Sequence, residues 1–303
     1  MTYLATKLVY FVIDMFAGRV RTPHYSVRHR NEYLSRDFDF IPVLGESSSS
    51  GVRSSMSGHS KWSTIKRAKG AADAKRGQLF TKLAREITVA TRSGVADIEA
   101  NARLRIAVQK ARKESMPKDN IDRAIARAAG TEGGEQFDEI YYEAYGPGGT
   151  ALMISTMTDN KNRTVGEVRA LLTRAGGNLA ENGAVSWMFD QTGLITLPVN
   201  GADPDELAMV AIDAGAMDFQ VEDDVVEVYT EPADLHKVQE LIVAAGYEPE
   251  SAELIMKPKT PLAPDVDAAV KAIRLLEKLE DLDDVQQVYS NLDISDDVLA
   301  AVS

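Results

Sequence analysis

Apolar residues recur at helical spacing between residues 61 and 130, a segment rich in Ala, Arg, Lys and Leu that contains a single proline. This composition favours helices. The first helix carries its apolar positions on one arc of its surface, at Leu79, Leu83, Ile87 and Ala90. A second helix is predicted from Ile98 to Glu114, and a third follows Pro117 and ends at Gly130. We therefore expect a small helical bundle in this segment.

Beyond residue 136, short apolar runs indicate strands that alternate with helices. Two strands, Tyr141–Tyr145 and Ala151–Met157, are joined by a glycine-rich loop. We interpret this loop as a hairpin turn, because no Gly-Lys-Ser/Thr follows it as a phosphate-binding loop would require. A helix is predicted over Thr164–Ala175, with Thr164 as its candidate cap, and a further strand over Val185–Phe189.

Between Leu194 and Lys257 the elements follow the order strand, helix, strand, strand, helix, strand. The four strands are Leu194–Val199, Met217–Val221, Val225–Tyr229 and Ser251–Met256. Asp203 followed by Pro204 marks the start of the first of these helices. Three helices in this half of the chain end in Ala-Gly, at Gly176, Gly215 and Gly246. The βαββαβ order is that of a ferredoxin-like domain.

The last predicted helix, Val266–Glu280, and the last strand, Val285–Asn291, lack a local partner, whereas the elements before residue 193 lack a helix and a strand. Both observations are explained if the segment 194–257 is inserted into a second α/β domain whose two parts flank it. We therefore predict an α+β chain in which a basic helical bundle, residues 56–130, is followed by two α/β domains of ferredoxin-like character, one inserted in the other. The outer domain comprises residues 131–192 plus 259–303, and the inserted domain comprises residues 193–258.

Near the end of the first 55 residues, a run of serines, Ser47–Ser50, together with Gly51 is typical of a flexible linker. Met56 lies five residues beyond Gly51. We expect residues 1–55 to be an extension outside the fold, either disordered or wrongly assigned, with Met56 as the natural start. No stretch of 18 apolar residues occurs, which argues against a membrane-spanning helix.

Charge is distributed unevenly along the chain. Residues 1–55 carry a net charge of +2, residues 56–130 carry +10 and residues 131–303 carry −24, which together give the −12 of the whole chain. The basic segment holds 17 Lys and Arg against 7 Asp and Glu. A basic module joined to acidic ones is typical of a protein that binds a polyanion, and a solvated basic face is the alternative.

The cations of the first helix lie on an arc separate from its apolar stripe, at Lys75, Lys82, Arg85 and Arg92. This arrangement lets them meet phosphates while the stripe packs. Trp62 either stacks on a base or anchors the core of the bundle, and the core is the favoured reading. The polar run from Asp159 to Thr164 contains Lys161 and Arg163, which serve either as a contact for a phosphate or a partner, or in capping a helix.

Signatures of catalysis and of metal binding are absent from the sequence. There are no cysteines, and the four histidines, His24, His29, His59 and His236, match no metal-ligand spacing. No nucleophile elbow, Walker loop or dinucleotide fingerprint occurs. The acidic run Glu222-Asp223-Asp224 lies between two predicted strands, where acidic turn residues are ordinary. We therefore expect a non-enzymatic protein without a cofactor, a metal or a small-molecule substrate.

Several longer motifs are similar to signatures of the YebC/PmpR family. The early ones are Gly58-His59-Ser60-Lys61-Trp62 and Asp73-Ala74-Lys75-Arg76-Gly77. The later ones are MPKDNI from Met116, YGPGG from Tyr145, TDNKNRT from Thr158 and SWMF from Ser186. The resemblance is highly specific, because several long motifs recur in order. It covers residues 56 to about 295 and does not include residues 1–55.

The resemblance implies a three-domain cytoplasmic protein of a family described either as DNA-binding transcriptional regulators or as translational activators acting at the ribosome. It implies contacts to DNA or ribosomal RNA at Lys61, Lys66, Arg67, Lys75, Arg76, Lys82 and Arg85, with Lys118, Lys161 and Arg163 as secondary candidates. We add Trp62 to these candidate contacts on the residue pattern alone, as the stacking alternative. A third hypothesis is that the basic bundle docks on the acidic domains of its own chain. The sequence leaves these three open, and it predicts no membrane partner.

Overall fold

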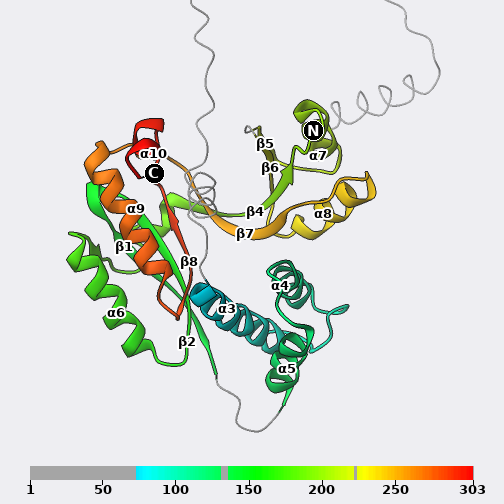
Figure 1. The fold of residues 1–303 in the computed structure, drawn as a ribbon, viewed down its shortest axis with the longest axis horizontal. Coiled ribbons are helices and arrows are strands. Elements are labelled where there is room, and N and C mark those ends of the chain that lie inside the picture. The colour runs from blue at the N-terminus through cyan, green and yellow to red at the C-terminus, as the bar shows by residue number, and fades with distance from the viewer. Residues whose placement is uncertain (1–72, 131–135, 222–223, 303) are drawn as a thin grey trace, which may run out of the picture. The chain divides into compact units, whose positions relative to one another are not determined.

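The computed structural model describes residues 73–130, 136–221 and 224–302, and of residues 73–75 it describes the backbone alone. The predicted extension, residues 1–55, therefore lies outside the described residues. Three helices form the bundle shown in Figure 1, namely α3 (Asp73–Arg92), α4 (Ala102–Lys113) and α5 (Lys118–Ala129). The predicted stripe on α3 is confirmed, because Leu83, Ile87 and Ala90 are buried together with residues of α4 and α5.

The second helix begins later than the sequence pattern predicts. We expected it from Ile98, but α4 starts at Ala102 because Asn101 caps it, accepting a hydrogen bond from the Leu104 N–H at 3.1 Å. The Asn101 amide also donates to the carbonyl of Ala90 at 2.8 Å, which fixes the turn between α3 and α4. The third helix follows Pro117 and stops before Gly130, as predicted.

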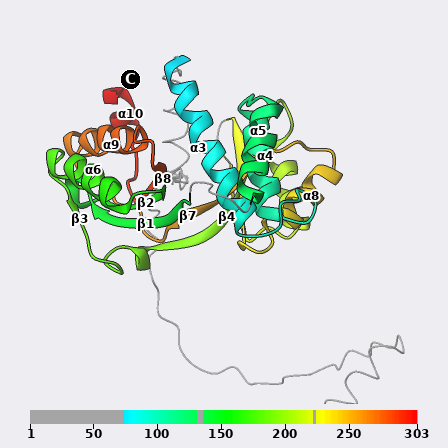
Figure 2. The ribbon, with the colours of Figure 1, turned by 90° about the horizontal axis from the view of Figure 1, so that it is seen from below.

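The first sheet combines elements from both ends of the acidic region. Its strands are β1 (Asp138–Tyr145), β2 (Ala151–Thr158), β3 (Asn178–Leu179) and β8 (Val285–Ser290), in the antiparallel order β3-β1-β2-β8. The pairing of β8 with β2 confirms the predicted partner of the last strand. Two helices, α6 (Lys161–Arg174) and α9 (Val266–Glu280), share one hydrophobic core with this sheet and lie on one side of it (Figure 2).

Two local predictions in this region were wrong. The segment Val185–Phe189 is not a strand, because residues 186–188 form a 3₁₀ turn before β4 begins. The buried carboxylate of Glu143 holds that turn by accepting the N–H groups of residues 183, 185 and 186 at 2.7–2.9 Å. Thr164 is not a helix cap either. Asn160 caps α6, and Thr164 is buried one turn inside the helix.

The second sheet has the ferredoxin-like order that the sequence predicts. Its strands are β4 (Phe189–Pro198), β5 (Asp218–Val221), β6 (Val225–Thr230) and β7 (Ser251–Pro258), in the antiparallel order β5-β6-β4-β7, with helices α7 (Pro204–Asp213) and α8 (Leu235–Ala244). Asp203 caps α7 by accepting from the Asp205 N–H at 3.0 Å. The helix-ending glycines Gly176, Gly215 and Gly246 all adopt positive φ angles.

The two sheets contact each other through the faces that their helices leave uncovered. Successive strand residues point to opposite faces, so Leu152 of β2 faces the helices while Met153 faces the second sheet. Met153 packs there in a cluster with Leu194, Ile255 and Tyr289. The inserted arrangement of the two domains is thus observed, while the exact boundaries at 193–258 stay a prediction. Among the described residues, no helix combines the length and apolar character needed to cross a lipid bilayer.

Candidate nucleic-acid interface

The predicted contact residues divide into three groups by where they lie. Lys61, Trp62, Lys66 and Arg67 lie outside the described residues, and of Lys75 only the backbone is described. Arg76, in the first turn of α3, and Lys118, at the start of α5, are exposed. The remaining candidates, Lys82, Arg85, Lys161 and Arg163, contact other parts of the chain.

Lys82 and Arg85, on the predicted cationic arc of α3, both contact the turn between α9 and β8. The Lys82 ammonium donates to the carbonyl of Glu280 at 2.5 Å. The Arg85 guanidinium donates to the carbonyl of Asp283 and forms an ion pair with the Asp284 carboxylate at 3.1 Å. These two cations therefore dock the bundle on an acidic turn of the outer domain. As nucleic-acid contacts they stay predictions.

Asp284 is the centre of a buried polar network. Its side chain is 3% exposed and accepts hydrogen bonds from Arg163 at 2.7 Å, Thr164 at 2.7 Å and Thr158 at 3.1 Å, in addition to the ion pair with Arg85. Burial alone would raise the pKa of Asp284, but the hydrogen bonds outweigh burial and lower the pKa below its ordinary value. The network ties β2, α6, β8 and α3 together at one carboxylate.

The TDNKNRT motif mainly builds this network. Arg163 binds Asp284 and also pairs with Asp159 at 2.7 Å, and Asn160 caps α6, so capping and internal pairing account for most of the motif. Lys161 forms an ion pair with Asp138 at 3.3 Å between two side chains that are both more than half exposed. Such an exposed pair contributes little to stability, which leaves Lys161 available to another anion.

Three further docking cations were missed by sequence reasoning, and all of them lie on α4. Arg103 pairs with Glu139 at 2.9 Å, and Arg105 contacts the His236 ring nitrogen at 2.5 Å. Lys113 donates to the carbonyl of Pro249 at 2.6 Å. No pattern in the sequence separates these cations from exposed ones, because their partners lie more than thirty residues away.

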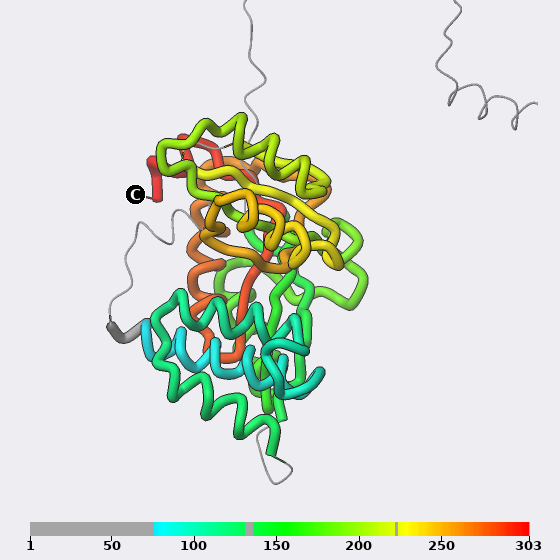
Figure 3. The backbone as a smooth tube through the Cα atoms, turned by 90° about the vertical axis from the view of Figure 1, so that its right-hand side faces the viewer, coloured from blue at the N-terminus to red at the C-terminus, as the bar shows by residue number. Residues whose placement is uncertain are grey.

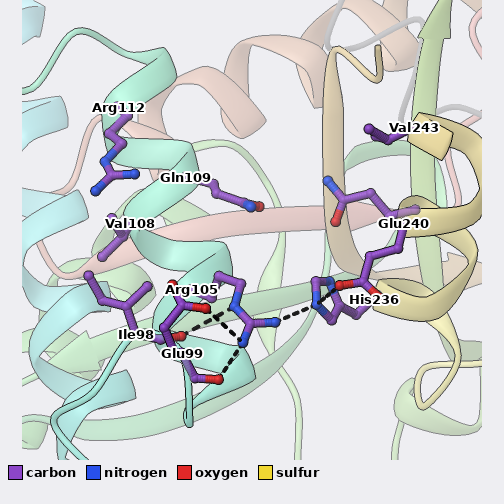
Figure 4. Close-up of a pocket in the computed structure, with 10 residues that line it drawn as sticks. Ile98, Glu99, Arg105, Val108, Gln109, Arg112, His236, Glu240 and Val243 are labelled. Carbon is purple, nitrogen blue, oxygen red and sulfur yellow. Dashed lines mark hydrogen bonds and ion pairs between the residues drawn. The ribbon is translucent and has the colours of Figure 1, made fainter. Parts of the chain in front are cut away.

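A cleft of about 470 Å³ lies between α4 and α8 (Figure 4). Arg105 crosses it to reach His236, which also lies 3.0 Å from Glu240. Its lining contains two arginines, Arg105 and Arg112, and two glutamates, Glu99 and Glu240. Because these charges balance, the cleft itself has no preference for a polyanion.

Four cations of the bundle make no ion pair or side-chain hydrogen bond within the described part of the chain, and we call them the open cations: Arg76, Arg112, Lys118 and Arg127. Three of them gather toward one end of the bundle. The end of α4 and the start of α5 are separated by only four residues, which brings Arg112 near Lys118. At the start of α4, Asn101 contacts Ala90, and near the end of α4 the Lys110 ammonium lies 3.3 Å from the Glu86 carboxylate. Helix α4 is therefore antiparallel to α3 and runs toward the first half of α3, which contains Arg76. Figure 3 shows the three helices side by side.

Two family descriptions match the chain. Residues 60–131 match the TACO1/YebC protein N-terminal domain, and residues 137–292 match the TACO1/YebC second and third domain. The first match spans the helical bundle together with the basic residues that precede α3, and the second spans both sheets.

Relatives and one solved structure cover most of the chain. A probable transcriptional regulatory protein of Roseiflexus castenholzii is 57% identical over 248 residues, which are 80% of this chain and 97% of the relative. A protein of the same name from Chloroflexus aurantiacus is 53% identical over 81% of this chain and 98% of its own length. The crystal structure of a conserved hypothetical protein from Aquifex aeolicus has a TM-score of 0.71 and 46% identity, and it covers 75% of this chain and 94% of that chain. The chain belongs to the TACO1/YebC family.

Proposed function

We propose that this protein is a regulator of gene expression that acts by binding nucleic acid rather than by catalysis, and that it binds through the open cations of its helical bundle. The relatives named probable transcriptional regulatory proteins support the regulatory role. The observation that carries the binding role is the separation of the bundle's cations into a docking set, which holds the acidic domains, and an open set without partners in the described part.

This separation decides which cations are useful for binding. A phosphate group that bound Lys82 or Arg85 would have to displace the acidic turn at Glu280–Asp284. Arg76 and Lys118, in contrast, are exposed to solvent. Arg76 also follows the basic residues Lys66 and Arg67 in the chain. The end of the bundle where Arg76, Arg112 and Lys118 gather is therefore the proposed contact surface.

A charge reversal of the open cations tests the proposal. The variant carries Arg76→Glu, Arg112→Glu and Lys118→Glu, and binding of a fluorescent DNA duplex is titrated at several salt concentrations. Each lost phosphate contact removes about 0.9 from the slope of log affinity against log salt, so the variant should lose up to about 2.7. The matched control reverses three exposed cations outside the bundle, Arg169, Arg174 and Lys271, and should keep the wild-type slope.

Equal affinity of the bundle variant and the wild type, with the helical circular dichroism signal intact, would refute the proposal. The docking hypothesis would then account for the basic bundle by itself. Repeating the titration with a ribosomal RNA hairpin, and sedimenting the protein with ribosomes in the presence and absence of nuclease, distinguishes the level of regulation. Preference for duplex DNA fits regulation of transcription, and nuclease-resistant sedimentation with ribosomes fits regulation of translation.

A further inference from the structure

The inserted domain carries a strong negative charge of its own. Residues 193–258 contain 15 Asp and Glu against two cations, Lys237 and Lys257, which gives a net charge of −13. Its α8 side contacts the basic bundle, through Arg105 on His236 and through Lys113 on the carbonyl of Pro249. The opposite side, formed by α7 and β5, makes no such contact among the described residues.

Apolar side chains are exposed on that opposite side. On α7 they are Met209, which is 58% exposed, and Ile212, which is 48% exposed. On the segment that leads into β5 and along the strand they are Met217, 51% exposed, and Val221, 40% exposed. Single exposed apolar residues are ordinary, but four at one edge of a small domain indicate an interaction surface.

The geometry of the domain places these residues together along its edge. Helix α7 covers β5 and β6, and α8 covers β4 and β7. The Glu206 carboxylate of α7 lies close enough to the hydroxyl of Tyr247, which follows α8, to raise the pKa of that tyrosine, so the Glu206 flank of α7 faces α8. Ile212 lies about 240° around the helix from Glu206 when the turn is followed across the buried stripe, and therefore on the opposite flank, toward β5. Because β5 pairs with β6 alone, its other edge is open in the described part.

Unpaired carboxylates flank the apolar residues on α7. Asp205 and Asp213 lie one helical turn on either side of Met209, and both are exposed. Neither carboxylate forms an ion pair with a described residue. The surface of α7 thus alternates acidic and apolar positions, and we call it, together with Met217 and Val221, the α7–β5 edge.

We propose that the α7–β5 edge binds a basic polypeptide segment of a partner protein, one that carries apolar side chains between its lysines or arginines. The net charge of −13 repels nucleic acid and also repels the inserted domain of a second copy. A basic segment with apolar residues matches both the carboxylates and the exposed Met209 and Ile212. This inference is independent of the proposed nucleic-acid binding, since the two use different domains and opposite charges.

The test uses the full chain and a short synthetic peptide in which Lys and Val alternate, with binding followed by fluorescence anisotropy. The Met209→Ser, Ile212→Ser double variant and the Asp205→Asn, Asp213→Asn double variant should each weaken binding by about fivefold or more. Leu241→Ser, which changes a 44%-exposed leucine on α8, is the matched control and should bind the peptide as the wild type does. Both double variants should retain wild-type affinity for duplex DNA.

Two comparison peptides show whether both features of the surface are used. A peptide of alternating Lys and Ser, and one of alternating Glu and Val, should each bind at least about fivefold more weakly than the Lys and Val peptide. The proposal is overturned if the Lys and Val peptide does not bind, if the Lys and Ser peptide binds equally well, or if Leu241→Ser weakens binding as much as the double variants do. Loss of DNA binding in the double variants would also count against it, because it would place nucleic acid on this edge.

Discussion

Replacing Asp284 with Asn tests whether one carboxylate joins the bundle to the outer domain. The asparagine keeps the shape of the side chain but offers one acceptor oxygen where the carboxylate offers two. It leaves Arg85 without its negative partner and leaves Arg163 with Asp159 alone. Breaking a buried ion pair costs about 3–5 kcal/mol. Because the Arg163 side chain is 41% exposed and can regain water, we expect the lower end, about 3 kcal/mol.

Urea denaturation followed by circular dichroism measures this loss directly, and in a domain of this size it corresponds to a fall in Tm of about 6–12 °C. Asp283→Asn is the matched control, since Asp283 lies in the same turn and its exposed side chain makes no ion pair among the described residues. That control should change the free energy of unfolding by less than about 0.5 kcal/mol. If the Asp284 and Asp283 variants lost equal stability, the network would not be the link that the structure indicates.

The same network predicts a dependence on pH. The pKa of Asp284 is lower in the folded protein than its ordinary value near 3.9, because hydrogen bonds to Arg163, Thr164 and Thr158 outweigh the effect of burial. Its contribution to stability is therefore complete above about pH 4 and is lost as the pH falls through the lower folded pKa. The difference in unfolding free energy between wild type and the Asp284→Asn variant should shrink over that acidic window, and a difference that grew there would contradict the assignment.

Three further predictions concern other parts of the fold. Leu83→Ala should lower the free energy of unfolding by about 2–5 kcal/mol in urea denaturation, because Leu83 is 2% exposed, and a loss below about 1 kcal/mol would show that the bundle core is not tightly packed. Glu143→Gln should lower the free energy of unfolding by about 1–3 kcal/mol and accelerate hydrogen exchange at the Val185 N–H, because this N–H loses its carboxylate acceptor. An unchanged exchange rate at the Val185 N–H would contradict this prediction. Replacing residues 194–257 with a short Gly-Ser bridge should leave a remainder that unfolds cooperatively, and a remainder without a thermal transition would argue against an independent outer domain.

The periodicity of the sequence predicts the elements well, because burial of one face decides them locally. Leu83 and Ile87 on α3 and the strand order of the inserted domain follow from pattern alone. The turn after Val185 was not predicted because it depends on Glu143, which lies 42 positions before Val185. Likewise, nothing in the sequence around Arg85 shows that it docks, since the Asp283 carbonyl that it binds lies 198 residues further on. Pattern identifies the cations, and only the tertiary fold separates docking ones from open ones.

The pairing of β2 with β8 has a consequence for the order of events during synthesis. The strand β2 ends at Thr158 and its partner begins at Val285, so the ribosome must add 127 residues before the outer sheet can close. At about 5–20 residues per second this takes roughly 6–25 s. All strand pairs of the inserted domain lie within residues 189–258, so its sheet can form before β8 of the outer sheet has been synthesised. Asp284 is synthesised just before β8. The helical bundle, although synthesised before both sheets, can therefore form its ion pair with the outer domain only at the end of synthesis.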